Sequence, residues 1–430
     1  MINYLVQRFL WFRERGFVQI TQKTLVSLFP FFLFSGIIRV VSLSVFSELG
    51  YINQLFSVSD WLPAFKITGQ VLNNLSSFLG GLAGPLSTYF AGKYTAGHYG
   101  RSTGTAGVTS LLVSLTIGSQ ELLMSPINDG DLTRINLPAS INIMLAIFVG
   151  YLVGQIFRFS RASDDQIVDK DYIYQPKTVR PIFLSLILAV GLNILLFVGE
   201  QRNVFQTIGQ YVSRITVTHN HLFSTFMMGL LNTFSAWVGN SQAFAHNAIT
   251  EDSFALENLT YAVSQHTTTG LPHLYTLTNL YHSYGLVAGI GSGLALLVAL
   301  LLKSTSFKDK KVSLLSVFPS LFNNGAPLMV GIPVLLNLVY LIPFLLAPMV
   351  NMGIAAVALA IRLMPAAVYP VPDGTPSLLY AFIGTGGSLR ALAVSLLCFA
   401  VDVAIFIPFV HLSNKVQHGL KEEGESNEVQ

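Results

Sequence analysis

Charged residues are scarce in this sequence. Asp, Glu, Lys and Arg make up 10% of the 430 residues, whereas soluble domains carry about 25%. Hydrophobic residues make up 52%, which leaves too little polar surface to cover a water-soluble fold of this length. The scarcity of charge therefore excludes a soluble protein and predicts one that crosses a lipid bilayer several times. The net charge of +3 is too small to indicate a nucleic-acid partner.

Cysteine is almost absent, since Cys398 is the only one. A single cysteine excludes an internal disulfide and a thiolate metal cluster. Its neighbours in SLLCFAVDV are apolar, so we interpret Cys398 as a packing residue. The motifs GxxxxGK[ST], HExxH and CxxC are also absent. His266, His273 and His282 have no acidic residue at a fixed spacing, so we expect no metal and no cofactor.

Apolar segments long enough to cross a bilayer as helices recur along the chain. Their approximate ranges are 24–47, 72–92, 104–120, 138–157, 181–199, 222–239, 284–302, 333–361 and 389–411. Clusters of Arg and Lys precede the first span and follow the fourth, so both ends of this four-helix segment are predicted to be cytoplasmic. The basic N-terminal residues 1–23 are predicted to form an interfacial helix.

The second half of the sequence is less regular. Lysines at 303–311 and at 415–421 indicate two more cytoplasmic segments. Counting the three spans from the cytoplasmic Arg180 to the lysines at 303–311 places those lysines on the wrong side of the membrane. The polar segment 240–283 is therefore expected to supply one further crossing or two half-crossings. The run 312–361 has no Asp, Glu, Lys or Arg, yet it contains five prolines. Two interrupted segments in one half of a membrane protein are typical of a transporter's midplane binding site.

These patterns divide the chain into three parts. Residues 1–200 are predicted to form a regular helical half, residues 201–415 a half with broken helices, and residues 416–430 a polar cytoplasmic tail. The glycine-rich GIGSGLAL at 289–296 is interpreted as part of a closely packed helix. Three charged residues fall at predicted membrane depth and are candidates for function, although an Arg near a span end can also reach the interface: Arg39, Arg390 and Asp402.

Polar residues at predicted membrane depth form two clusters. Their side chains offer hydrogen-bond donors and acceptors that do not ionise, and a tryptophan ring stacks on the apolar face of a sugar. This combination predicts a site for a neutral, polyhydroxylated ligand. The alternative is that these groups only satisfy backbone left open by the helix breaks. The candidate residues are Trp237, Asn240, Ser241, Gln242, His246, Asn323, Asn324, Gly325 and Ala326.

Several of these segments resemble a known family. The run 317–351, with GIPVLLNLVYLIPFLLAPMVN at its end, is similar to the membrane IIC component of the sugar phosphotransferase system, in its lactose, cellobiose and diacetylchitobiose branch. The segments AFIGTGGSLRALAV at 381–394, AWVGN at 236–240 and QKTLVSLFPFFLFSGII at 22–38 resemble the same branch. The resemblance extends over nearly the whole chain.

The resemblance implies an all-α polytopic membrane protein of the glucose-superfamily IIC type, with about ten transmembrane helices plus re-entrant hairpins. It further implies a homodimer formed through residues 1–200 and an elevator-like movement of residues 201–415 that carries the sugar. A IIB partner acting in trans phosphorylates the sugar from a phosphocysteine. The implied location is the bacterial cytoplasmic membrane, with both termini in the cytoplasm.

The sequence departs from the family pattern at two positions. The family reads Asn-x-Asn-Glu-Pro where this chain reads NNGAP at 323–327, so Ala326 replaces the sugar-binding Glu. Ser241 stands where the family has the His next to the reacting hydroxyl. Phosphoryl transfer needs a group that accepts the hydroxyl proton, and neither Ala nor Ser does this well. His246 is a possible substitute base, and the catalytic residues are otherwise unknown.

Three functions follow from these observations. The first is a phosphotransferase-type permease that binds and translocates a disaccharide of the cellobiose or chitobiose type. The second is a degenerate IIC-like domain that binds or senses a ligand without phosphorylating it and is coupled to a cytoplasmic signalling domain. The third, a dimerising membrane anchor, explains the polar helix breaks least well. The missing Glu and His argue against enzymatic phosphotransfer.

Overall fold

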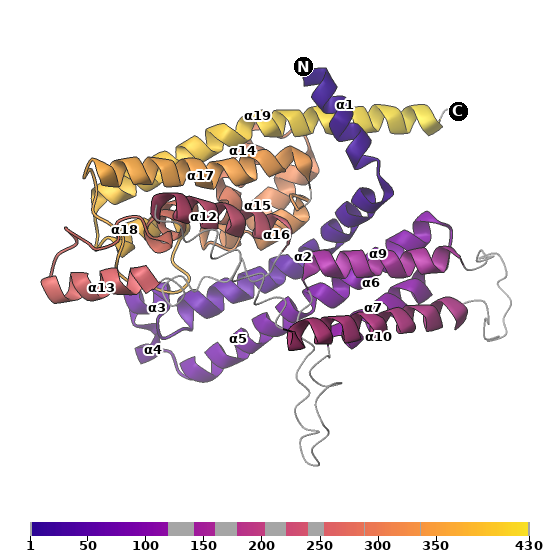
Figure 1. Ribbon diagram of the computed structural model, residues 1–430, viewed down its shortest axis with the longest axis horizontal. Coiled ribbons are helices and arrows are strands. Elements are labelled where there is room, and N and C mark those ends of the chain that lie inside the picture. Colours follow the sequence, from indigo (N-terminus) through magenta and orange to yellow (C-terminus); the bar gives the residue numbers. More distant parts are fainter. Residues whose placement is uncertain are drawn as a thin grey trace, which may run out of the picture. The chain divides into compact units, whose positions relative to one another are not determined.

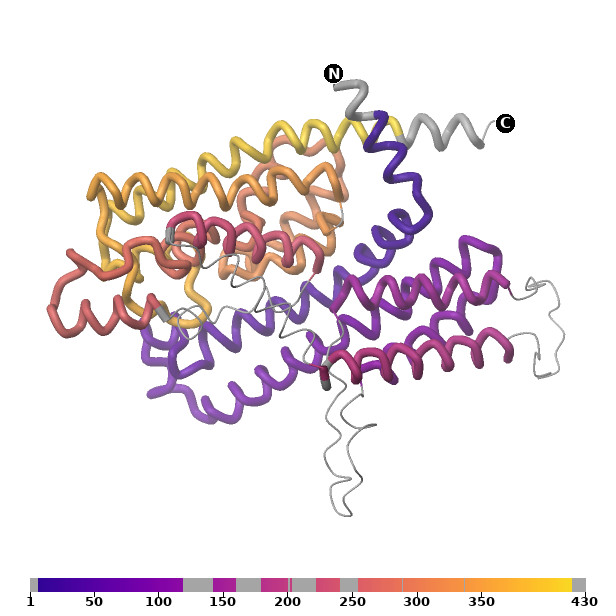
Figure 2. The backbone as a smooth tube through the Cα atoms, in the orientation of Figure 1, coloured from indigo at the N-terminus to yellow at the C-terminus, as the bar shows by residue number. Residues whose placement is uncertain are grey.

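The computed structural model describes residues 2–118, 142–159, 179–202, 221–239 and 253–428, with the exception of residues 288 and 336 (Figure 2). Helices account for most of these residues, and among them the only β-type pairings are two isolated bridges. The predicted all-α fold class is therefore confirmed. The number of transmembrane helices stays a prediction.

The chain forms two compact units, which we name unit 1 and unit 2. Unit 1 comprises Met1–Arg13, Phe32–Ser76 and Val212–Gln430, and unit 2 comprises Glu14–Phe31 and Ser77–Tyr211. The helix α2 (Gly16–Val45) contributes its first part to unit 2 and its last part to unit 1. The helix α5 (Phe65–Gly81) is divided in the same manner. The roles assigned above to residues 1–200 and 201–415 stay predictions.

Unit 2 is a bundle whose helices pack through small residues (Figure 1). A methyl group on Gly150 would overlap the carbonyl of Thr88, and one on Gly154 would overlap the side chain of Thr95. Because glycine has no side chain at these positions, α6 and α9 approach closely, as membrane helices commonly do. The bundle helices are α6 (Ala83–His98), α7 (Thr103–Gly118), α9 (Ile143–Arg158) and α10 (Val179–Gln201).

Unit 1 contains the broken helices. The long helix α19 (Leu389–Glu428) packs against both α14 (Gly293–Lys303) and α17 (Leu338–Ala360) (Figure 1). The helices of unit 1 besides α2 and α5 are α1 (Ile2–Arg13), α3 (Tyr51–Phe56), α4 (Val58–Trp61), α12 (His221–Trp237), α13 (Ser253–Gln265), α14 (Gly293–Lys303), α15 (Phe307–Leu321), α16 (Ala326–Gly331), α17 (Leu338–Ala360), α18 (Tyr380–Gly384) and α19 (Leu389–Glu428). Short π and 3₁₀ segments are η3 (Thr278–Gly285), η4 (Ile290–Ser292) and η5 (Ser377–Leu379).

Residues 32–76 are attached to the C-terminal part of unit 1. The amide of Tyr51 donates to the Asp373 carbonyl at 2.8 Å, and the amide of Asp373 donates to the Leu49 carbonyl at 2.9 Å. Gly374 lies so close to Ser44 that an added Cβ would be 2.7 Å from the Ser44 Cβ. These contacts join positions more than 300 residues apart, which explains why this early segment belongs to unit 1.

Several helices are long and apolar enough to cross a bilayer. Among the described residues these segments are Gly16–Val45, Val179–Gly199, Thr278–Lys303, Leu338–Ala360 and Leu389–Gly419, with Thr103–Gly118 and Ile143–Arg158 as shorter apolar helices. The span predicted at 72–92 is divided between α5 and α6, which meet at Leu82, and its crossing of the bilayer stays a prediction. Helices cover the other predicted spans, except where the backbone breaks, but α2 begins well before residue 24, at Gly16, and α19 continues far beyond residue 411, to Glu428.

A buried polar pair connects α17 and α19. The Asn351 Nδ2 donates to the Asp402 Oδ2 at 2.9 Å, and both side chains are fully buried. The hydroxyl of Ser292, in η4, faces the same carboxyl group. This hydrogen bond therefore connects α17 to α19. Without it, the side of the buried carboxyl group that faces Asn351 would have no donor.

The Asn351–Asp402 pair yields a stability prediction. We expect Asn351→Leu to lower the free energy of unfolding by about 1–3 kcal/mol, because the Asp402 carboxyl loses its buried donor. The double variant Asn351→Leu, Asp402→Leu removes both partners and should recover part of this loss. Melting of the purified protein in detergent, followed by intrinsic fluorescence, compares the three proteins. A double variant less stable than the single one contradicts the interpretation.

Candidate functional site

The predicted break at 323–327 is a turn between α15 and α16. Asn323 has φ of 63°, and the Asn324 amide donates to the Pro319 carbonyl at 2.9 Å. This pattern is a helix C-terminus closed by a left-handed residue, a position that Asn adopts more readily than most other residues. Asn323 therefore has a local backbone role. The residues 322–326 are all half-buried, so their side chains keep access to a ligand.

This turn, which we name the tip (residues 322–325), lies against α2. The Asn324 Nδ2 donates to the Gly36 carbonyl at 3.4 Å. A Cβ on Gly36 would lie 2.9 Å from the Pro327 Cγ, so the absence of a side chain there makes room for the proline. Gly36 is a site residue that sequence reasoning missed, since nothing in its own neighbourhood indicates which segment packs on it.

A second break lies at 287–293, within the span that was predicted as a continuous helix. Gly289, Gly291 and Ser292 have φ of 81°, 60° and 56°, and only glycine enters this left-handed region readily. A side chain on Gly291 would also overlap the ring of Phe344. The interpretation of GIGSGLAL as a packed helix is therefore wrong for 289–292, and helix α14 begins at Gly293. Glycine at every second position was the available signal for a break.

The two breaks meet in unit 1. A Cβ on Gly289 would lie 3.3 Å from the Asn323 Oδ1, and a Cβ on Gly293 would lie 3.9 Å from the Gly325 Cα. The tip therefore rests on the unwound segment 289–293. Helices α12 and α17 both contact η4, the 3₁₀ turn of that segment. Backbone groups freed from helical hydrogen bonding are thus gathered at one place inside protein, as a membrane site requires.

Trp237 ends α12. Its side chain is 6% exposed and stacks on Phe234, with ring centroids 6.0 Å apart. Within the described residues, its buried indole Nε1 has no hydrogen-bond partner. A buried N–H group without a partner is uncommon in native proteins, and a ligand hydroxyl is one acceptor that would satisfy it. Asn240, Ser241, Gln242 and His246 lie outside the described residues.

The structure brings part of the predicted site together. Asn323, Asn324 and Gly325 form the tip, and Ala326 begins α16. Trp237 belongs to α12, which contacts η4. The His273 Nε2 lies 2.7 Å from the Glu257 Oε2, so this histidine has an acidic partner on α13. Among the described residues, no three His, Cys, Asp or Glu side chains gather as metal ligands do.

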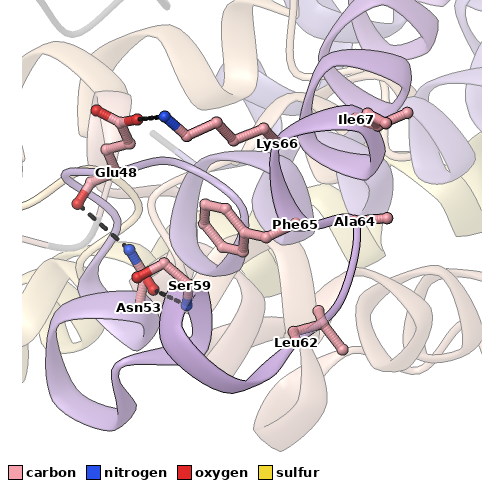
Figure 3. A pocket seen from close by; sticks show the side chains of 8 residues that line it. All are labelled: Glu48, Asn53, Ser59, Leu62, Ala64, Phe65, Lys66 and Ile67. Carbon is pink, nitrogen blue, oxygen red and sulfur yellow. Dashed lines mark hydrogen bonds and ion pairs between the residues drawn. The ribbon is translucent and has the colours of Figure 1, made fainter.

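A pocket of unit 1 lies away from these residues. It has a volume of about 460 Å³, and its wall is formed by α3, α4 and the start of α5 (Figure 3). The Glu48–Lys66 ion pair at its rim spans 3.2 Å, and both side chains are largely exposed. The amide of Ser59 donates to the Asn53 Oδ1 at 2.8 Å, which closes the loop below. None of the predicted sugar-site residues lines this pocket.

Comparison with known proteins assigns the family. The sequence model described as "Phosphotransferase system, EIIC" matches residues 22–348, which is well over half of the chain. The chain belongs to the phosphotransferase system EIIC family. This membership confirms the predicted resemblance and the membrane location, because EIIC proteins are membrane proteins. It does not test the individual site residues.

Curated relatives of this EIIC protein are similar over shorter stretches. The cellobiose-specific EIIC component of Lactococcus lactis is 33% identical over 137 residues, or 32% of this chain and 28% of the relative. The lichenan permease IIC component of Bacillus subtilis is 28% identical over 162 residues, or 37% of this chain and 35% of the relative. The matched part thus spans about a third of each relative's length.

One solved structure is also similar. It is the crystal structure of the transporter ChbC, the IIC component from the N,N'-diacetylchitobiose-specific phosphotransferase system. The alignment covers 96% of both chains at 20% sequence identity, with a TM-score of 0.41.

The second break yields a prediction about glycine. We expect Gly291→Ala to destabilise the EIIC protein by more than about 2 kcal/mol, because it combines an unfavourable φ with a clash against Phe344. Gly353→Ala is the matched control, because Gly353 lies inside α17 with no atom within 4 Å of an added Cβ. That control should leave the melting temperature in detergent unchanged or raise it. Equal melting temperatures for the two variants would disprove the described break.

Proposed function

We propose that this EIIC protein binds a disaccharide of the cellobiose or chitobiose type and carries it across the bacterial cytoplasmic membrane. The observation that supports this most is the meeting of the tip with the unwound segment 289–293. Interrupted helices that meet are typical of transporter binding sites. The relatives named for cellobiose and lichenan support the choice of substrate class.

The side chains around the breaks suit such a ligand. Trp237 offers an indole donor that has no partner among the described residues, beside an aromatic surface, and a sugar presents both hydroxyl acceptors and an apolar face. Asn323 and Asn324 add amides that donate and accept without carrying charge. We infer that these three residues, with Gly325 and the segment containing Asn240, Ser241, Gln242 and His246, form the sugar site.

The two halves of the chain are proposed to have different roles in transport. Residues 1–200 form the dimer interface, and residues 201–415 carry the sugar by an elevator-like movement. Both termini are proposed to lie in the cytoplasm, where the basic residues gather. A IIB protein acting in trans is the proposed phosphoryl donor.

The replaced acid supports a second candidate function. In phosphotransfer the sugar oxygen bonds to phosphorus, the phosphorus–sulfur bond of the donor breaks, and the hydroxyl proton passes to a base. Ala326 is half-buried at the start of α16 and carries only a methyl group, so it accepts no proton. A protein that binds the sugar without phosphorylating it, as a sensor or facilitator, fits this substitution. His246 is the remaining candidate base.

Transport measurements separate the two functions. The protein is reconstituted in vesicles and offered labelled cellobiose, chitobiose and lactose, with and without IIB and its phosphoryl donors. Accumulation of sugar phosphate that depends on IIB supports the permease. Saturable binding without sugar phosphate supports the sensor and contradicts phosphotransfer. The absence of both binding and uptake for the whole panel would refute the proposed substrate class.

Two variants test the site. Trp237→Phe keeps an aromatic ring but removes the Nε1 donor, and we expect sugar affinity to fall about tenfold, the value of one hydrogen bond. Trp61→Phe is the control, because Trp61 is 64% exposed and its Nε1 already donates to the Phe56 carbonyl. Calorimetric titration with the sugar checks both. Equal affinities for the two variants would mean that the site is misplaced.

A further pair separates ligand binding from backbone geometry at Asn323. Asn323→Gly keeps a residue that adopts positive φ but removes the amide, so it should weaken sugar binding and leave the melting temperature nearly unchanged. Asn323→Ala removes the amide and also the tolerance for positive φ, so it should lower sugar affinity and the melting temperature together. If Asn323→Gly binds sugar normally, the amide serves only the backbone turn.

A further inference from the structure

Unit 2 contains a pocket that the sugar site does not use. Its volume is about 230 Å³, and it lies between the first turns of α2, the last turns of α6 and the start of α7. The residues that line it are Gln19, Ile20, Lys23, Lys93, Tyr94, Gly97, His98 and Thr103. It shares no residue with the tip, with Trp237 or with the second break.

The pocket is basic and has no acidic lining residue. Lys23 and Lys93 enter it from two helices, and neither ammonium group has an ion-pair partner within the described chain. The described part of unit 2 contains only two acidic residues, Glu14 and Glu200. Its basic residues are Arg15, Lys23, Lys93, His98, Arg101, Arg158, Arg180 and Arg202. The pocket therefore favours an anion.

Neighbouring contacts hold the walls of the pocket in place. The Ser27 hydroxyl donates to the Lys23 carbonyl at 2.9 Å and lies 2.6 Å from the Tyr94 hydroxyl. Because the Ser27 hydroxyl proton is already donated to the Lys23 carbonyl, the Tyr94 hydroxyl donates to the Ser27 oxygen. This hydrogen bond fixes the Tyr94 ring as one wall of the pocket. The Arg158 guanidinium lies 4.8 Å from the centre of the Tyr99 ring, next to the turn that follows α6. Donation to an anion is thus left to the lysines, His98 and Thr103.

The position of the pocket indicates where its anion comes from. Lys23 and Arg158, at the end of α9, belong to the basic clusters that mark the predicted cytoplasmic end of this bundle, and Lys93 follows the predicted second span, which ends on the same side. Large apolar side chains on the same helices are exposed, among them Val108, Leu112 and Phe148, as expected of surfaces that face lipid. Basic pockets between membrane helices on the cytoplasmic side suit anionic lipid headgroups.

We propose that this pocket binds a phosphate group through Lys23, Lys93 and Thr103, and that an anionic phospholipid headgroup supplies it. The first turn of α7, which begins at Thr103, adds backbone N–H groups that favour a phosphate oxygen. His98 lines the same pocket, whereas Glu14 does not. Lipid bound here would connect α2, α6 and α7 at one end of unit 2.

The test uses the full-length protein in nanodiscs and counts retained lipids by native mass spectrometry. The wild type should retain phosphatidylglycerol in preference to phosphatidylcholine. The double variant Lys23→Gln, Lys93→Gln should lose this preference by about tenfold or more, since each lysine near a lipid phosphate contributes to binding. Lys23→Arg, Lys93→Arg keeps both charges and should retain it. An unchanged preference in the Gln variant would overturn the proposal.

Two controls keep the result specific. The variant Lys303→Gln, Lys308→Gln removes the same charge from unit 1, where both side chains are exposed, and should bind lipid normally. Equal loss in this variant would mean a general effect of charge and would refute the pocket. A third measurement compares how inorganic phosphate and phosphatidylglycerol each change the melting temperature. If only inorganic phosphate raises it, the pocket binds a soluble phosphate and the proposed lipid source is refuted. Sugar affinity of each variant verifies that it is folded.

Discussion

Every backbone N–H and C=O group at membrane depth must find a partner within the protein, and the architecture of unit 1 depends on this constraint. The chain leaves helical geometry at Gly289–Ser292 and again at Asn323. Neither break could face lipid without leaving several polar groups unsatisfied. Each break is therefore covered by the other, with α2 on one side and α17 close by. The same arrangement that makes the breaks tolerable also concentrates polar groups in one place.

Sequence reasoning predicted the helices and one of the two breaks. Long apolar runs such as 181–199 indicate helices because nothing in them competes with helical geometry. The tip was predictable as well, because two amides, a glycine and a proline in succession are poor helix formers. The second break was missed because alternate glycines fit two structures equally well: a close helix contact or a left-handed turn. The ring of Phe344, more than fifty residues away, decides between them.

The remaining differences also arise from contacts that are distant in sequence. The run 72–92 is an exception, because it contains polar residues such as Asn73 and Asn74 and carries Gly80 and Gly81 where α5 ends, a local signal that hydropathy alone does not register. The attachment of residues 32–76 to the C-terminal part depends on Asp373 and Gly374, which carry no sign of it in their own neighbourhood. The dual character of Asn323 illustrates the same limit. Its side-chain amide favours a ligand site in the sequence, whereas the structure shows its backbone closing a helix, which the residue type alone does not distinguish.

The burial of Trp237 has an optical consequence. The protein has three tryptophans, and Trp11 and Trp61 are 56% and 64% exposed while Trp237 is 6% exposed. With the two exposed residues replaced by phenylalanine, the remaining fluorescence would come from one indole at the end of α12. Its emission would respond to a change in the polarity around this buried indole. The protein thus carries an intrinsic reporter that would follow ligand arrival in real time, without a chemical label.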